Sequence, residues 1–174
     1  ALVGNSTDAT LGKTQGASGS DTLASDIGIS GGTGDNRIEN RGTIDVLAKT
    51  YSEASSSATA GWGKPIASSE AVAEASAVGI DVGAGNNVIV NAGQLTVKAE
   101  ATAYGHSWAE EDSGDLADED AKATATATSK AWGILTGNGG NLIVNNGSII
   151  VTATAKPDAV AETEDNDVER RTPS

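Results

Sequence analysis

Apolar residues recur with a period of two inside a block of 22 residues that occurs three times without a gap. In the first copy Ile44, Val46 and Ala48 lie two residues apart, which places them on one face of a β-strand. Glycine-rich stretches between such segments supply the backbone conformations of turns. Each block therefore predicts a short strand, a glycine turn, a second strand, an Asn-Gly corner and a third strand. The three copies span residues 27–48, 78–99 and 132–153.

The recurrence of this block indicates an array in which each unit buries its apolar face on the next. Successive copies begin 51 and 54 residues apart, and tandem units of this kind are typical of solenoids. The chain contains no Phe, Met or Cys and only three Trp and two Tyr, so stacked Ile, Val, Leu and Ala must fill a narrow core. The predicted fold is all-β: a parallel β-solenoid (β-helix) of about three rungs, with Ala/Thr-rich strand excursions between rungs.

The spacers between blocks, 49–77 and 100–131, have an alternation of their own. Alanine occupies every second position over residues 71–77 and again over 121–127, with Thr or other residues between. Alanine has low strand propensity, so this pattern indicates close packing where only methyl groups fit. Each spacer is interpreted as an outgoing strand, a protruding excursion that carries the aromatic residues, and a returning strand. A helix is the alternative, against which the Thr and Ser at alternate positions argue.

Six asparagines recur in register and predict structural ladders. Equivalent residues of successive rungs stack at about 4.8 Å, so each side-chain amide can donate to the next. Ligand binding is the alternative role for these residues. The two sets are Asn36, Asn87 and Asn141, and Asn40, Asn91 and Asn145.

The segment Gly31–Glu39 (GGTGDNRIE) resembles the calcium-binding nonapeptide of secreted repeat-in-toxin proteins, with Asn36 where that motif carries Asp. More broadly, the three blocks resemble secreted bacterial β-solenoid repeats, such as the passengers of autotransporters and haemagglutinin-type adhesins. This resemblance implies a β-solenoid fold and a secreted, extracellular setting at the cell surface. It does not imply an activity.

The net charge limits the binding partners that the chain can have, and a cluster of acidic residues forms one candidate metal site. Lys plus Arg number 11 and Asp plus Glu 24, and a net charge of −13 repels phosphate backbones and anionic lipid surfaces. No apolar run approaches the roughly 20 residues that a membrane helix needs. A cluster of carboxylates between the second and third blocks could hold Ca²⁺, the one cofactor considered, with a solvated acidic loop as the alternative. The cluster comprises Glu110, Glu111, Asp112, Asp115, Asp118, Glu119 and Asp120.

The sequence predicts no enzyme. Catalysis needs a positioned acid–base pair or an activated nucleophile, whereas Cys is absent, His106 is the single histidine and no nucleophile or phosphate-loop motif occurs.

Outward-facing positions of the blocks predict an assembly face. These positions are charged in the first block but apolar in the second and third, and a strand that is apolar on both faces is normally covered on both. A spacer strand or another subunit is expected over them. The assembly face comprises Leu142, Val144, Ile150, Val88 and Val90.

Three segments are expected along the chain: a strand or arm over residues 1–26 that completes or docks on a rung, the three-repeat solenoid over 27–153, and a strand with an acidic tail over 154–174. Neither end shows a polar capping repeat, and open solenoid ends invite strand addition. The bottom of one chain is therefore expected to stack on the top of the next. A fragment of a longer solenoid is the alternative.

The expected function is that of a structural subunit in an extracellular fibre or surface assembly. It would polymerise head-to-tail by rung stacking and strand addition, so its partners would be copies of itself. The alternative is a passenger segment of a bacterial adhesin that binds a host protein or a glycan. No nucleic-acid partner and no membrane insertion are expected.

Overall fold

The computed structural model describes residues 2–9, 14–61, 63–111 and 119–165, which contain ten β-strands and no helix. It confirms the predicted all-β fold, a parallel β-solenoid of about three rungs. Each rung consists of a long incoming strand, a short strand and a long outgoing strand. The rungs are β2 (Thr14–Gly32), β3 (Arg37–Asn40) and β4 (Thr43–Ala60); β5 (Pro65–Val82), β6 (Val88–Asn91) and β7 (Gln94–Glu111); and β8 (Asp120–Thr136), β9 (Leu142–Asn145) and β10 (Ser148–Asp165).

Equivalent strands of successive rungs pair in parallel to form three sheets. Their orders are β2-β5-β8, β3-β6-β9 and β1-β4-β7-β10. The register brings each block position onto its counterpart, as in the row Ile38, Ile89 and Ile143. The additional strand β1 (Leu2–Ala9) pairs only with the distal half of β4, Glu53–Ala60. Within the described residues, no helix is long and apolar enough to pass through a bilayer.

The expected segment boundaries lie inside strands of the structure. Residue 26 falls within β2, which continues from Thr14 to Gly32, and residue 153 falls within β10. The residues beyond Asp165 lie outside the described part of the chain.

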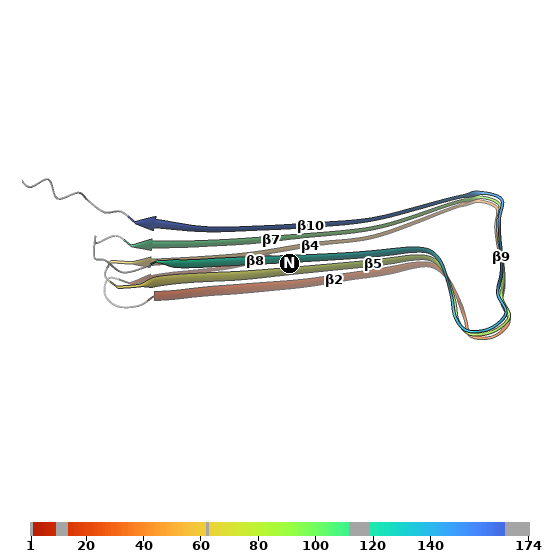
Figure 1. Ribbon diagram of the computed structural model, residues 1–174, viewed down its shortest axis with the longest axis horizontal. Coiled ribbons are helices and arrows are strands. Elements are labelled where there is room, and N and C mark those ends of the chain that lie inside the picture. The colour runs from red at the N-terminus through yellow and green to blue at the C-terminus, as the bar shows by residue number, and fades with distance from the viewer. Residues whose placement is uncertain (1, 10–13, 62, 112–118, 166–174) are drawn as a thin grey trace, which may run out of the picture.

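The molecule is broad within a rung and shallow along the stack. Figure 1 shows the long strands in two layers that are joined at one end by the short strands, with the rungs superposed along the viewing direction. A strand of 18 residues extends for about 60 Å, whereas the first and third strands of a stack lie only about 10 Å apart. The two open ends of the solenoid are therefore its largest faces.

The core has two parts of different composition. Near the short strands it contains branched side chains of the middle rung, including Ile80, Ile89, Leu95 and Val97, all with no exposed surface. Along the long strands it contains mainly alanine. The buried alanines of β5 and β7 that face each other are Ala71, Ala73, Ala75, Ala77, Ala99, Ala101 and Ala103. The sequence pattern is therefore explained by two sheets separated only by methyl groups.

The close approach of the sheets changes the interpretation of the spacers. The strands β4 and β7 continue for 18 residues each, so the spacers form the long arms of each rung and not protruding loops. The expectation that aromatic residues protrude was wrong for Tyr51, Tyr104, His106 and Trp108, which lie within these strands. Trp62 lies outside the described residues. Small interior side chains allow both strands to extend, because nothing forces the sheets apart.

Buried hydroxyls connect the two sheets across the arm. Ser107 Oγ donates to Ser69 Oγ at 2.9 Å and lies 2.7 Å from the carbonyl oxygen of Lys122. Ser52 Oγ donates to Ser20 at 2.9 Å. A buried hydroxyl without a partner costs about 1–3 kcal/mol, so these pairs remove a penalty that a serine-containing interior would otherwise carry.

Gly105→Ala tests the separation of the sheets. A Cβ at this position would lie 2.6 Å from the carbonyl oxygen of Thr124 on the opposite sheet, and we expect this overpacking to cost about 1–3 kcal/mol. Gly19→Ala is the matched control, because a Cβ there would meet nothing within 4 Å. Urea unfolding should show a loss for the first variant and little change for the second. Equal midpoints would contradict the close packing.

Candidate functional site

The six repeated asparagines lie in two columns that run through the stack. Asn36 Nδ2 donates to Asn87 Oδ1 at 2.8 Å, and Asn87 Nδ2 donates to Asn141 Oδ1 at the same distance. Each amide also donates to carbonyl oxygens of its own glycine turn, as Asn87 does to Gly83 at 3.1 Å. One side chain therefore fixes the turn of its rung and the distance to the next rung.

The second column lies at the Asn-Gly corner. Asn40 Nδ2 donates to Asn91 Oδ1, and Asn91 Nδ2 donates to Asn145 Oδ1, both at 2.7 Å. Asn91 is completely buried. The corner of the middle rung thus depends on amide partners in the rungs on both sides.

A third column was not foreseen from the sequence. Asp35 Oδ1 accepts a hydrogen bond from the backbone N–H of Asn86 at 2.7 Å, and Asn86 Oδ1 accepts one from the backbone N–H of Gly140 at 3.1 Å. Because the three positions carry Asp, Asn and Gly, residue identity does not repeat. The sequence does contain one signal for this column. In the first two copies a residue with an acceptor side chain, Asp35 or Asn86, directly precedes the repeated asparagine.

The columns have a direction. Every side-chain amide donates toward the following rung, so the third rung ends in donors. Asn145 Nδ2 has no acceptor among the described residues, and Asn141 Nδ2 reaches only carbonyl oxygens of its own turn. At the other end, Asn36 Oδ1 accepts no hydrogen bond within the described part of the chain. One open face presents amide donors and the opposite face presents an amide acceptor.

The open face of the third rung also exposes its interior. Ile143 and Val151 occupy the same inward positions as Ile89 and Val97 of the middle rung. The middle pair has no exposed surface, whereas Ile143 is 46% and Val151 is 44% exposed. The difference arises because no rung lies above them. This face therefore combines apolar side chains with unpaired strand edges.

The assembly face lies on the sides of the rungs and not on their open ends. Val88 pairs with Leu142, and Val90 pairs with Val144, on the outer side of β6 and β9. Leu142 and Ile150 are exposed, whereas Val88, Val90 and Val144 are partly buried. The first rung carries charged residues there, with a 2.8 Å ion pair between Arg41 and Glu39. No described segment of the chain covers the apolar positions.

The acidic residues are only partly described. Asp112, Asp115 and Asp118 lie outside the described residues, Glu110 and Glu111 end β7, and Glu119 and Asp120 lie at the return into β8. Glu111 points into the core and has no exposed surface, whereas Glu110 is partly exposed. Within the described part of the chain, no three His, Cys, Asp or Glu side chains are grouped so that they could hold a metal ion.

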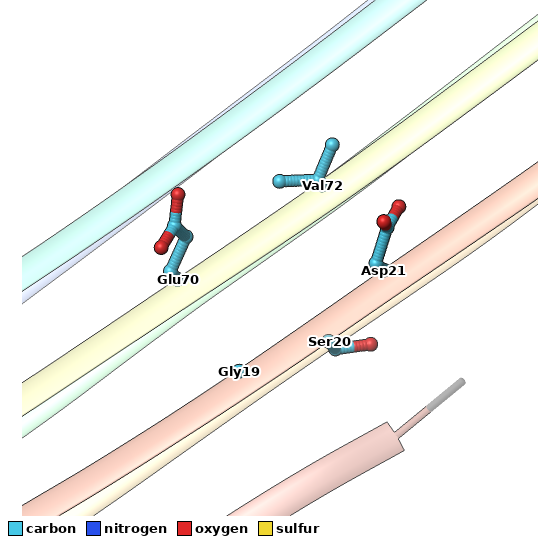
Figure 2. A pocket seen from close by; sticks show the side chains of 5 residues that line it. All are labelled: Gly19, Ser20, Asp21, Glu70 and Val72. Carbon is cyan, nitrogen blue, oxygen red and sulfur yellow. The ribbon is translucent and has the colours of Figure 1, made fainter.

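A shallow hollow of about 360 Å³ lies on the first two incoming strands. It is lined by Gly19, Ser20, Asp21, Glu70 and Val72. Figure 2 shows Asp21, Glu70 and Val72 directed to one side of the sheet, where Gly19 contributes no side chain. Two carboxylates on an open surface provide too few ligands for a cation such as Ca²⁺.

Aromatic residues lie on the outer face of β4 and β7. The rings of Tyr51 and Tyr104 are 5.5 Å apart at a tilt of 47°. The Tyr51 hydroxyl donates to Glu53 Oε2 at 2.7 Å. This hydrogen bond, followed by desolvation and by the negative charge of Glu53, raises the pKa of Tyr51. Tyr51 therefore stays a hydrogen-bond donor at neutral pH.

Comparison of the chain with protein-family models, with curated proteins and with solved structures finds no match.

Asn91→Ala tests the asparagine columns. The change removes the acceptor of Asn40 and the donor to Asn145 inside a buried corner, and we expect a loss of about 1–3 kcal/mol in the free energy of unfolding. Asn146→Ala is the control, because Asn146 is exposed and forms a hydrogen bond only through its backbone N–H. If both variants unfold at the same urea concentration, the columns do not stabilise the fold.

Glu53→Gln tests the electrostatics of the tyrosine pair. We expect the pKa of Tyr51 to fall, because a neutral amide no longer opposes formation of the tyrosinate. The titration is followed by tyrosinate absorbance in a Tyr104→Phe background, which leaves one tyrosine in the chain. Glu70→Gln, on the other sheet, should leave the titration unchanged. A pKa that stays raised in Glu53→Gln would refute the assignment.

Proposed function

We propose that the chain is a non-enzymatic structural subunit of an extracellular fibre or surface assembly, and that copies of it polymerise head-to-tail through their open rungs. The observation that carries the proposal is the contrast between the middle and third rungs. The same inward positions are completely buried in one and nearly half exposed in the other. A further rung on this face would bury Ile143 and Val151 and supply partners for three strand edges.

The direction of the asparagine columns supports a head-to-tail contact. Donors on one open face meet an acceptor on the other when the bottom of one copy lies on the top of the next. Such a contact is heterologous, because each copy uses two different surfaces, and it produces a filament when it does not close into a ring. Two third rungs placed face to face would bring donors against donors.

Strand addition gives a second element of the proposed contact. β1 already pairs in parallel with the edge of β4 at Glu53–Ala60, which supports the capacity of this edge to accept a strand. In a continuous stack, β10 of the copy below takes the whole edge of β4. β1 must then leave its place, so polymerisation includes an exchange of strands along the arm.

The extracellular setting of the proposal comes from the resemblance of the blocks to secreted solenoid repeats, and a sequence without cysteine is compatible with it. Calcium remains part of the proposal as a cation that could stiffen the contacts through the acidic segment at residues 110–120. The second candidate function, a passenger segment of an adhesin, is favoured by one observation. Exposed aromatic residues lie on a flat outer face and contribute nothing to the core.

Ile143→Lys tests the stacked contact against the lateral one. A charge on the open face would be buried without a partner in a stack, so we expect filaments to disappear in electron microscopy and the chain to sediment as a monomer. The fold should remain, because Ile143 is already half exposed in the single chain.

Leu142→Lys is the control, because Leu142 is next to Ile143 in the sequence but lies on the lateral face of the rung, where it is 56% exposed. It should leave filaments intact. Loss of filaments in Leu142→Lys alone would assign assembly to the lateral face, and a monomeric parent chain at high concentration would overturn the proposal. Filaments that persist with Ca²⁺ and disappear with a chelator would place calcium in the contacts.

A further inference from the structure

An aromatic strip lies on the outer face of the arm, on the sheet that contains β4 and β7. Strand alternation places Tyr51 on the outside of β4, and Tyr104 and Trp108 on the outside of β7. Tyr51 is 47% and Tyr104 is 39% exposed, and Trp108 is partly exposed. We define the aromatic strip as Tyr51, Tyr104 and Trp108.

The strip has no role in the core of the solenoid. The positions that alternate with it, such as Ala103, Ser107 and Ala109, are buried and fill the space between the sheets. The interior is complete with small side chains, whereas large rings stand on the solvent side. Tyr and Trp rings combine a large apolar area with a polar group, so exposed rings on the outer face of a sheet offer a surface on which a ligand can stack.

Polar groups lie beside the rings, and they interrupt the strip between the contacting pair Tyr51–Tyr104 and Trp108. The Tyr51 hydroxyl is held by Glu53 at 2.7 Å, and His106 lies 3.7 Å from Glu162 between Tyr104 and Trp108 along the strand. The core of a protein–protein interface is instead a continuous apolar patch from which charged residues are depleted. The strip therefore suits a ligand that offers apolar faces and hydroxyl groups at short intervals.

Charge excludes the anionic ligands that also stack on aromatic rings. Single-stranded nucleic acids combine base stacking with a positive groove, whereas this chain carries a net charge of −13 and has carboxylates of Glu53 and Glu162 beside the rings. Acidic sugars are repelled in the same way. Neutral and cationic ligands remain, and among these the hydrogen-bonding groups beside the rings suit a neutral ligand that is rich in hydroxyl groups.

We propose that the aromatic strip binds a neutral oligosaccharide. The apolar faces of two sugar rings stack on Tyr104 and Trp108, whose Cα atoms are about 13 Å apart along the extended strand. Hydroxyl groups of the sugar donate to the carboxylates of Glu53 and Glu162. This distance fits a chain of sugars and not a monosaccharide.

The site is independent of the proposed stacking contact, because the strip lies on the outer face of a sheet and stacking uses the strand edges. In a filament, strips of successive copies lie along one side. Weak binding at each strip then adds up through multivalency. A single chain retains one complete strip, so the binding test does not require filaments.

Binding is measured by calorimetry with the purified chain and defined hexasaccharides. The neutral probes are linear β-1,4-glucose, β-1,4-N-acetylglucosamine and α-mannose oligomers, and the anionic probe is an oligogalacturonate of equal length. We expect at least one neutral probe to bind and the anionic probe to fail. Trp108→Ala and Tyr104→Ala should each weaken binding about tenfold, the loss typical of one removed stacking ring.

Trp132→Ala is the matched control. Trp132 is 39% exposed on β8, which belongs to the other sheet, so its removal should leave affinity unchanged. Circular dichroism melting checks the fold of each variant, and Tyr51→Ala, at the most exposed ring of the strip, serves as an additional variant if Trp108→Ala melts early.

Three outcomes would overturn the proposal. They are failure of all neutral probes to bind, an equal loss in Trp132→Ala and Trp108→Ala, and equal affinity for the anionic probe. A polypeptide that binds the strip without competition from any sugar would identify a protein interface instead. A monomeric chain that binds a neutral probe would support the strip while contradicting the fibre, so the two proposals fail separately.

Discussion

The structure depends on one constraint, the parallel in-register pairing of equivalent residues at the spacing of a β-sheet. At the inward and corner positions of the blocks, residues of the middle rung lie between counterparts of similar chemistry, so asparagine lies on asparagine and isoleucine on isoleucine. Hydrogen bonds of the backbone, amide columns and apolar contacts are all satisfied by the same translation of about 4.8 Å. A rung at either end satisfies this constraint on one side only.

The width of the rung follows from the residues between the sheets. Alanine, serine and glycine let the two layers approach so closely that Gly105 cannot accept a Cβ without a clash with Thr124. A thin interior contributes little buried area for each residue, since a methyl group buries much less surface than a leucine side chain. The branched residues near the short strands therefore supply most of the apolar burial, and the arms extend the strand edges. A broad and shallow stack results, in which stability is concentrated in the middle rung, whose inward side chains are buried.

Some of this organisation could be predicted from the sequence and some could not. The blocks repeat in residue identity, so their strands, the glycine turns and the rows of asparagine follow from period and register. The length of the long strands in the arms was harder to predict. Alanine has low strand propensity, so a run such as Ala71–Ala77 has no intrinsic preference strong enough to mark where a strand ends. Tertiary packing of one sheet on the other decides that length. The column through Asp35 and Asn86 was not predicted, because its side chains accept hydrogen bonds from backbone N–H groups. Residue identity at these positions is therefore free to vary. The position of Tyr51 and Trp108 on a flat face depends on the full length of these strands, which the sequence did not show.

The open ends impose a direction on any association that extends the stack. A copy turned upside down would run its strands antiparallel to β10 and would place Asn145 opposite another amide donor, so neither the backbone register nor the columns could continue. Only a translated copy keeps like residues over like. The lateral faces are free of this constraint, because their outward residues differ between rungs. These residues are charged around Arg37 and Glu39, apolar around Leu142, and aromatic along the arm. The strand edges at the open ends accept only a matching rung, so this part of the surface suits copies of the chain. The lateral faces carry residues that differ from rung to rung, so that part suits different ligands.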